Sequence, residues 1–160
     1  MRAWKNGTQL IEPPSGALED FDQIITVSEI PKPVQLGWVH IFPKRYESFF
    51  WYRRSGAVAM PRVADLPPLV VCSTWGVERM GHPLVLYGST KDKAHVTARR
   101  FLLGHEAGHL RQFERGEYPE DSQYHEDEAH EWSCEVFRRL GWDVEAAEFM
   151  NWRWKQQRDH

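Results

Sequence analysis

The sequence contains little cysteine and no long hydrophobic segment, and these absences exclude several protein classes. Its 160 residues include two cysteines, Cys72 and Cys134, and neither belongs to a CxxC pair. This spacing does not indicate a disulfide framework, so we expect a reduced, cytoplasmic protein in which Cys72 packs as a small apolar side chain. Nowhere do about 18 apolar residues follow one another, and we therefore expect neither a membrane span nor a signal peptide.

An excess of positive charge is also missing. The formal net charge is −3 and the isoelectric point is near 6.2. The basic residues are scattered along the chain, so nucleic acid is not an expected partner. The length suits a single domain. Aromatic residues, in contrast, make up 13% of the chain and include eight tryptophans, which predicts extensive aromatic packing.

The chain changes character near residue 91, where short β-type segments give way to helical ones. Runs of β-branched and aromatic residues between prolines and glycines predict strands at 34–42, 49–54, 57–63, 69–74 and 83–90. Helices are expected at 92–116, 124–140 and 143–157. Asp92 and Asp143 are candidate N-caps, and Gly116 and Gly141 are candidate helix ends. Strands followed by helices indicate an α+β domain with a small, mostly antiparallel N-terminal sheet.

The first 33 residues differ from both halves, because they contain the proline-bearing segments EPPSG and IPKPV. We expect this N-terminal lead either to form a short helix between two irregular stretches or to be flexible. It would precede a domain at residues 34–160 and is a candidate for covering its cleft.

The strongest motif is His105-Glu106-Ala107-Gly108-His109, which fits the pattern HExxH. On a helix the two histidines lie about 40° apart, so both imidazoles project from one face and can share a metal ion. Glu106 lies about 100° from His105, where a general base would stand beside the metal. The arc around both histidines also contains apolar residues, which predicts a buried ligand face: Ala98, Phe101, Leu102 and Phe113.

Two glycines, Gly104 and Gly108, lie together on one flank of this helix. Each costs about 1 kcal/mol of helix stability relative to alanine. They therefore indicate that a neighbouring element approaches the helix closely. Because HExxH also arises by chance, a third metal ligand is the necessary further test.

The segment at residues 124–141 offers the candidates for this third ligand. In a helix its apolar stripe consists of Ala129, Trp132, Val136, Phe137 and Leu140. Glu126 falls inside the stripe, and a buried carboxylate is costly unless it is paired or bound to a metal. Glu126 is therefore the predicted third ligand. Four other carboxylates are predicted to face solvent: Asp127, Glu128, Glu131 and Glu135.

His130 lies at the edge of the same stripe, about 100° from Ala129. It could orient a ligand, support the Glu126 carboxylate, donate to the developing oxyanion or bind the metal itself. The simplest alternative is a partly exposed histidine at the edge of the core. Further candidate oxyanion donors, not distinguished by their spacing, are Tyr87, Tyr118, Tyr124 and His125.

These motifs resemble a known family. RRFLLGHEAGH is similar to the RFxLAHELGH signature of ImmA/IrrE-type metallopeptidases, and EDEAHEWSCEVF resembles their ExxA(N/D)xFAxxLL helix. The resemblance implies a zincin-like fold, with Zn²⁺ held by His105, His109 and Glu126 and with Glu106 as the base. The sequence differs from the family pattern at His130, where the family has Asn or Asp, and a minimal gluzincin outside this family fits nearly as well.

Zincin-like folds place the active helix under a small sheet whose edge strand holds an extended substrate. Residues 83–90 are the candidate edge strand, although a purely structural strand is an equal alternative. We expect a zinc-dependent peptidase that acts on a peptide or a narrow range of protein substrates. The alternative is a zincin-like metal-binding regulatory or interaction module without general proteolytic activity.

Overall fold

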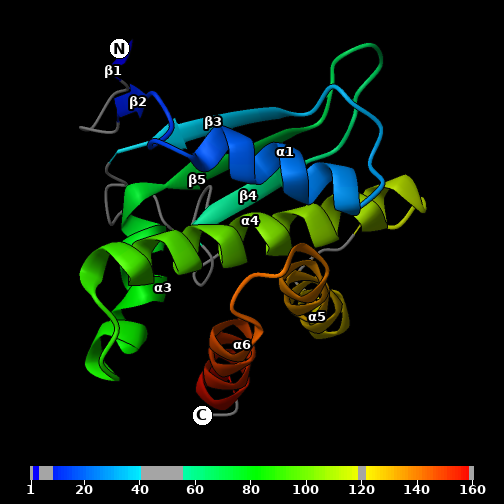
Figure 1. Ribbon diagram of the computed structural model, residues 1–160. Helices are drawn as coiled ribbons and strands as arrows, with labels where there is room; N and C mark the ends of the chain where they lie inside the picture. Colours follow the sequence, from blue (N-terminus) through cyan, green and yellow to red (C-terminus); the bar gives the residue numbers. More distant parts are fainter. Residues whose placement is uncertain (1, 4–8, 41–55, 119–121, 159–160) are drawn as a thin grey trace.

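The computed structural model describes residues 2–3, 9–40, 56–118 and 122–158, and these residues form an α+β arrangement (Figure 1). The sheet is mixed and has the strand order β1-β2-β3-β5-β4. Strands β3 and β5 pair in parallel, and the other pairings are antiparallel. The strands are β1 (Arg2–Ala3), β2 (Gln9–Ile11), β3 (Gln35–Val39), β4 (Ala57–Met60) and β5 (Leu69–Ser73). The predicted α+β class is confirmed.

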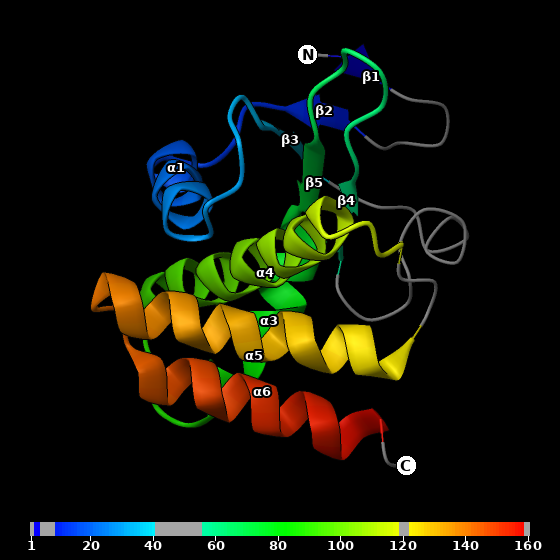
Figure 2. The same ribbon diagram turned by 90° about the vertical axis from the view of Figure 1, so that its right-hand side faces the viewer.

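The described residues contain five helices: α1 (Ala17–Val27), α3 (Thr74–Leu86), α4 (Lys91–Glu114), α5 (Gln123–Leu140) and α6 (Val144–Arg158). Figure 2 shows α1 beside the sheet, with α4, α5 and α6 one below another. The helix α5 therefore packs between α4 and α6. These helices are too short or too polar, within the part of the chain that is described, to cross a membrane.

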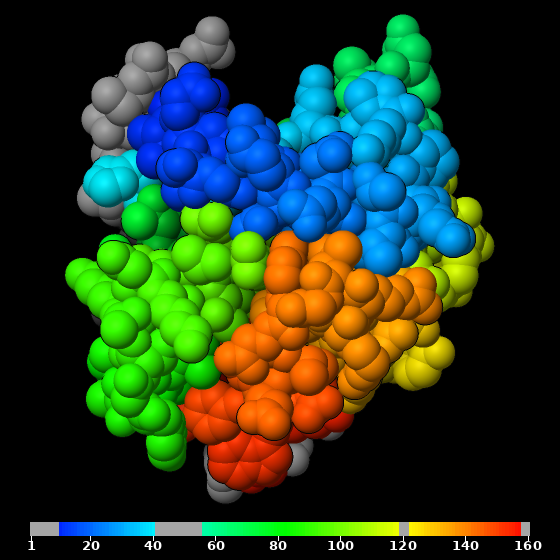
Figure 3. All heavy atoms as spheres, viewed as in Figure 1, coloured from blue at the N-terminus to red at the C-terminus, as the bar shows by residue number. Residues whose placement is uncertain are grey.

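The N-terminal lead contributes regular structure to the fold. Strand β2 pairs with β3, and α1 packs against α4 and α5. Asp20 of α1 accepts hydrogen bonds from Arg99 and Arg100 of α4. By helix geometry, these two arginines are rotated about 120–140° around α4 from His105. In the space-filling view, α1 (blue) lies directly against the C-terminal part of α5 (orange) (Figure 3).

The predicted strand at residues 83–90 is wrong, because α3 continues to Leu86. Ser73 caps this helix, and its hydroxyl accepts a hydrogen bond from the Gly76 backbone N–H at 2.9 Å. Gly81 packs so closely on α4 that an added methyl group would lie 3.1 Å from the Ala94 carbonyl oxygen. This packing outweighs the interruption at Pro83, which lies inside the helix. In the described residues the edge beside β5 is formed by β4 instead.

Most other boundaries lie within a few residues of those predicted. Strands β3, β4 and β5 overlap the predicted strands, whereas the prediction for 49–54 lies outside the described residues. The N-cap of α4 is Thr90 and not Asp92, since the Thr90 hydroxyl accepts from the Lys93 N–H. Asp143 does cap α6 by accepting from the Ala146 N–H at 3.2 Å. Gly116 and Gly141 both have positive φ and follow helix ends, as predicted.

The core surrounds α4 on more than one side. One apolar cluster joins α4 to α1, the sheet and α5, and it includes Phe21, Trp38 and Leu103. A second cluster joins α4 to α3, α5 and α6, and it includes Phe101 and Phe137. Residues 101–110 of α4 are consequently all buried. The sequence predicted one buried face on this helix, but the whole central part is enclosed.

Candidate metal centre

The close approach of α4 and α5 brings the two predicted halves of the site together. A methyl group added at Gly108 would lie 2.7 Å from Ala129 Cα, and one added at Gly104 would lie 2.5 Å from Ser133 Oγ. Both distances are shorter than the usual 3.5–4.0 Å between packed carbon atoms. The two glycines therefore let α5 lie against α4, and α5 is the neighbouring element whose close approach the sequence predicted. This contact fixes Glu126, one turn before Ala129, opposite the histidines.

The side chains of His105, His109 and Glu126 converge on one point. Their candidate ligand atoms all lie within 4.8 Å of one another. Glu126 places one carboxylate oxygen 3.1 Å from His105 Nε2 and the other 3.0 Å from His109 Nε2. The two Nε2 atoms are 3.0 Å apart. These three residues form a group that can bind a metal ion, and the structure thus brings together the predicted ligand set.

The donor spacing matches the coordination shell of a small cation. Ligands at about 2.0–2.1 Å from a tetrahedral ion lie roughly 3.3 Å from one another. The observed separations of 3.0 to 3.1 Å are close to that value. Two nitrogen lone pairs and a carboxylate repel at this distance unless a proton or a cation lies between them. The donor set therefore fits a metal ion on its geometry and its charge.

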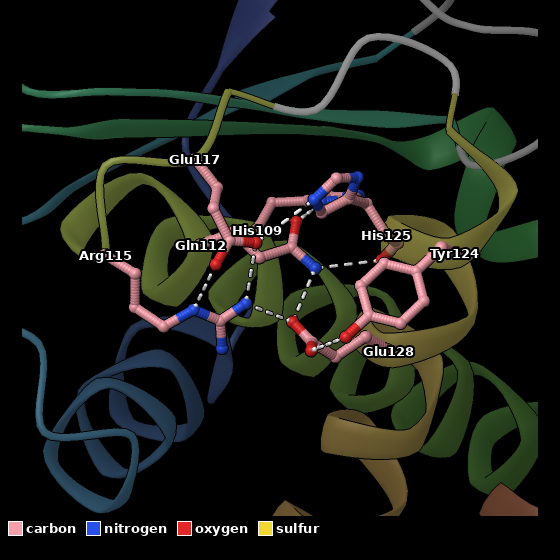
Figure 4. A network of polar contacts seen from close by, with 7 residues as sticks. All are labelled: His109, Gln112, Arg115, Glu117, Tyr124, His125 and Glu128. Atoms are coloured by element: carbon pink, nitrogen blue, oxygen red, sulfur yellow. Dashed lines mark hydrogen bonds and ion pairs between the residues drawn. The ribbon is translucent and has the colours of Figure 1, made fainter.

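The residue that orients His109 is Gln112 (Figure 4). The Gln112 side chain is fully buried. The Gln112 amide N–H₂ donates to the His125 backbone carbonyl and to Glu128. Its carbonyl oxygen is then left to accept from His109 Nδ1, at 2.8 Å. With the proton on Nδ1, the lone pair of His109 is on Nε2, the atom that faces His105 and Glu126.

A wider polar network fixes Gln112 in turn. Arg115 lies 2.6 Å from the same Glu128 oxygen that Gln112 contacts, and it also pairs with Glu117. Glu128 was predicted to face solvent, but Arg115 and Gln112 draw its carboxylate back onto α4. Figure 4 shows this carboxylate between Arg115, Gln112 and Tyr124. The α4 C-terminus and the α5 N-terminus are therefore joined through charged hydrogen bonds.

The four candidate oxyanion donors have other contacts. The Tyr124 hydroxyl donates to Glu128, and His125 Nε2 lies 3.1 Å from Glu117. Tyr87 packs against Phe149, and Tyr118 packs against Phe113. These contacts therefore do not single out any of the four side chains as an oxyanion donor beside His105, His109 and Glu126.

Glu106 is buried beside the three donors, and only 2% of its surface is exposed. One carboxylate oxygen lies 3.7 Å from His105 Nε2. Burial raises the pKa of Glu106, and the opposing effects of His105 and His109 do not cancel this rise. A carboxylate whose pKa is raised is a stronger base than an exposed glutamate. Glu106 thus lies where the HExxH motif predicted a base.

The ionisation states of Glu126 and His109 depend on the groups around them. Burial opposes ionisation of Glu126, but His105 and His109 hold its pKa well below the usual range. Burial also opposes protonation of His109, but its hydrogen bond to Glu126 and the charges of Glu106 and Glu126 raise its pKa to about 9. The metal-free group therefore holds a proton in the place where a cation would bind.

His130 is buried, with 2% of its surface exposed, so the alternative of a partly exposed edge histidine is wrong. Its ring stacks on Trp154 of α6, with the centroids 4.4 Å apart, and it meets the His105 ring edge-on at 4.1 Å. His130 Nδ1 lies 2.9 Å from the Glu126 backbone carbonyl. Burial and the neighbouring His105 lower its pKa, which favours a neutral ring. His130 packs against the group of three donors but is not one of them.

Both cysteines are buried free thiols. Burial raises the pKa of Cys72, and it raises that of Cys134 to about 12. Neither belongs to the metal-binding group found in the described residues. Cys72 lies in the first apolar cluster, which agrees with its predicted packing role.

Sequence reasoning did not identify Gln112 or Trp154 as parts of this site. Gln112 lies three residues after His109, so helical spacing places both on one side of α4. That spacing was a usable signal for Gln112. Trp154 had no comparable signal, because its contact with His130 depends on how α6 folds back over α5.

Comparisons with protein-family models, curated proteins and solved structures gave no match. The resemblance to ImmA/IrrE-type metallopeptidases therefore remains a prediction from the motifs.

Proposed function

We propose that this protein is a zinc-dependent peptidase of the gluzincin type, related to the ImmA/IrrE-type metallopeptidases. The observation that carries the proposal is the convergence of His105 Nε2, His109 Nε2 and the Glu126 carboxylate at 3.0 to 3.1 Å, with a buried Glu106 beside them. Two imidazoles and one carboxylate are a ligand set of catalytic zinc sites, which keep one position open, whereas structural sites usually close with four protein ligands.

Each residue then has a defined task. His105, His109 and Glu126 would hold the ion, and Gln112 keeps the His109 lone pair on Nε2. When bound, zinc would polarise the peptide carbonyl. It would also lower the pKa of water, so that water can act as a nucleophile near neutral pH. Glu106 removes the proton from the attacking water and delivers it to the leaving amine nitrogen. The neutral His130 ring excludes water from one side of His105.

The sheet offers a place for an extended substrate. Strand β4 lies at an edge of the sheet in the described residues, and α4 packs against it. A peptide can add to such an edge by backbone hydrogen bonds, which brings it across the helix that carries the histidines. β4 takes the role that the sequence suggested for residues 83–90. A peptide or protein substrate is therefore proposed, in a cytoplasmic setting.

The decisive experiment compares the wild type with Glu106→Gln. Zinc content is measured by atomic absorption after dialysis, and hydrolysis of a peptide library is followed by mass spectrometry. We expect about one zinc ion per chain in both proteins, because Glu106 is outside the donor group. The rate in Glu106→Gln should fall by about 10²–10⁴-fold, since the substitution removes the base.

A matched control is Glu114→Gln, the same substitution on the same helix. Glu114 is exposed and pairs only weakly, at 3.5 Å, with Arg62. It should change neither zinc content nor rate. Absence of bound zinc in the wild type would refute the proposal. Zinc binding with no cleavage of any library peptide would instead support the metal-binding regulatory function.

A further inference from the structure

A cavity of about 260 Å³ between α3 and α6 carries positive charge but no negative charge. Its lining includes two arginines, Arg79 and Arg153, and the amide of Gln157. Met80 and Trp154 form apolar walls. No carboxylate is among the lining residues, although the whole chain has a net charge of −3. A cavity with this lining attracts an anion that also has an apolar part.

Arg153 indicates where such an anion would bind. Its Nε–H is buried and has no hydrogen-bond partner among the described residues. A buried donor without a partner costs about 1–3 kcal/mol, so such groups are rare unless a ligand or water supplies the acceptor. A guanidinium fork matches the two oxygens of a carboxylate. The chemistry of the cavity therefore favours a carboxylate.

The cavity lies beside the metal centre. Trp154, one of its walls, stacks on His130, and His130 in turn contacts the His105 ring. On its other side, Gly76 packs directly against Gly56, the residue before edge strand β4. A peptide that extends along β4 past the histidines advances about 3.4 Å per residue. The cavity is thus joined to the start of β4 through Gly76 and Gly56 and to the histidines through Trp154 and His130.

We infer that this cavity is a specificity subsite that binds a carboxylate of the substrate, on an aspartate or glutamate side chain near the scissile bond. This inference rests on the proposed peptidase function. Arg153 would hold the carboxylate through Nε and a terminal nitrogen, and Arg79 adds charge from the opposite helix. Met80 and Trp154 pack against the methylene groups of the bound side chain.

Peptide hydroxamates test the inference without requiring cleavage. In a series of alanine-based hydroxamates, a single glutamate occupies each position in turn, and every member has a glutamine counterpart. A further pair ends in a free carboxylate or in an amide, which separates a side-chain carboxylate from a chain terminus. Binding to the zinc-loaded protein is measured by calorimetry. At one position the glutamate compound should bind at least about ten-fold more tightly than its glutamine counterpart.

Arg153→Met should remove this preference, because it weakens binding of the glutamate compound far more than binding of the glutamine compound. The matched control is Lys155→Met, which also removes one positive charge from α6 but lies outside the cavity, where Lys155 pairs with Glu131. This control should keep the preference. If Arg153→Met does not fold, Arg79→Met provides the same test from α3.

The failures of the two proposals are distinguishable. Equal binding of every glutamate and glutamine pair would overturn the subsite while leaving the peptidase function in place. A preference for the free C-terminal carboxylate alone would also overturn the assignment to a side chain. Absence of zinc and of hydroxamate binding would overturn the peptidase function and the subsite together.

Discussion

Replacing Gly108 by alanine should separate α4 from α5 and weaken metal binding at the same time. The new methyl group would lie 2.7 Å from Ala129 Cα, 3.0 Å from Ala129 Cβ and 3.2 Å from its carbonyl oxygen. Packed carbon atoms normally lie about 3.5–4.0 Å apart, so the helices must move apart by roughly 1 Å. Two of these atoms belong to the backbone, and a change of rotamer cannot relieve the contact.

The free energy of unfolding follows from two opposing effects. Alanine is better than glycine inside a helix by about 1 kcal/mol. Overpacking costs about 1–3 kcal/mol, with the upper end expected where backbone atoms collide. The net destabilisation should therefore be about 2 kcal/mol. Metal ligands tolerate displacements of only about 0.2 Å, so a movement of α5 that displaces Glu126 should weaken zinc binding at least about ten-fold.

Urea unfolding of the metal-free protein and competition with a chromophoric zinc chelator measure the two effects. Gly37→Ala is the matched control, because a methyl group there would meet Val71 Cγ2 at an ordinary 3.6 Å. It should change stability by no more than about 0.5 kcal/mol and leave zinc affinity intact. If Gly108→Ala were as stable as the wild type and bound zinc equally well, the close helix contact would not be what positions Glu126.

Two further predictions concern the residues around the donors, and a third concerns the ion pairs of Asp20 on another side of α4. Gln112→Leu should weaken zinc binding about 10–100-fold in chelator competition, because the proton of His109 would no longer be held on Nδ1. Zinc affinity should rise with pH up to about 9, by up to ten-fold per unit, since the ion displaces the proton of His109, whose pKa is raised from 6.5 to about 9. A zinc affinity that does not change between pH 6.5 and 9 would contradict this displacement of the His109 proton. By the same linkage, protonated His109 stabilises the metal-free protein, and this stabilisation is complete below about pH 6.5 and is lost as the pH rises through about 9. Asp20→Asn should destabilise the protein by about 2 kcal/mol in urea unfolding through its contacts with Arg99 and Arg100, but should leave zinc affinity unchanged.

The group of three candidate donors was predictable because each member depends on local helical geometry. The spacing of His105 and His109 places them on one face of a helix, and the position of Glu126 on an apolar stripe distinguishes it from its acidic neighbours. Gly104 and Gly108 likewise predicted the close approach of a neighbouring element, which the structure identifies as α5, because glycine inside a helix is costly unless packing requires it. Each of these inferences uses residues within a few turns of one another.

The errors arose where distant parts of the chain decide the outcome. Pro83 and the neighbouring β-branched residue suggested a strand, but the packing of Gly81 on α4 keeps this segment helical. Glu128 was expected to face solvent, and Arg115, at the C-terminal end of α4, reverses that expectation. His130 lies at the edge of its own stripe and is nevertheless enclosed, since Trp154 of α6 covers it. Helical periodicity within one segment contains no information about such partners.

The stacking of Trp154 on His130 makes the surroundings of the three donors depend on the C-terminal part of the chain. The donors lie on α4 and α5, between residues 105 and 126, whereas the ring that covers one face of His130 comes from α6. A chain shortened by α6 would therefore keep all three donors and lose this cover, so that the His130 ring would be open to water on that face.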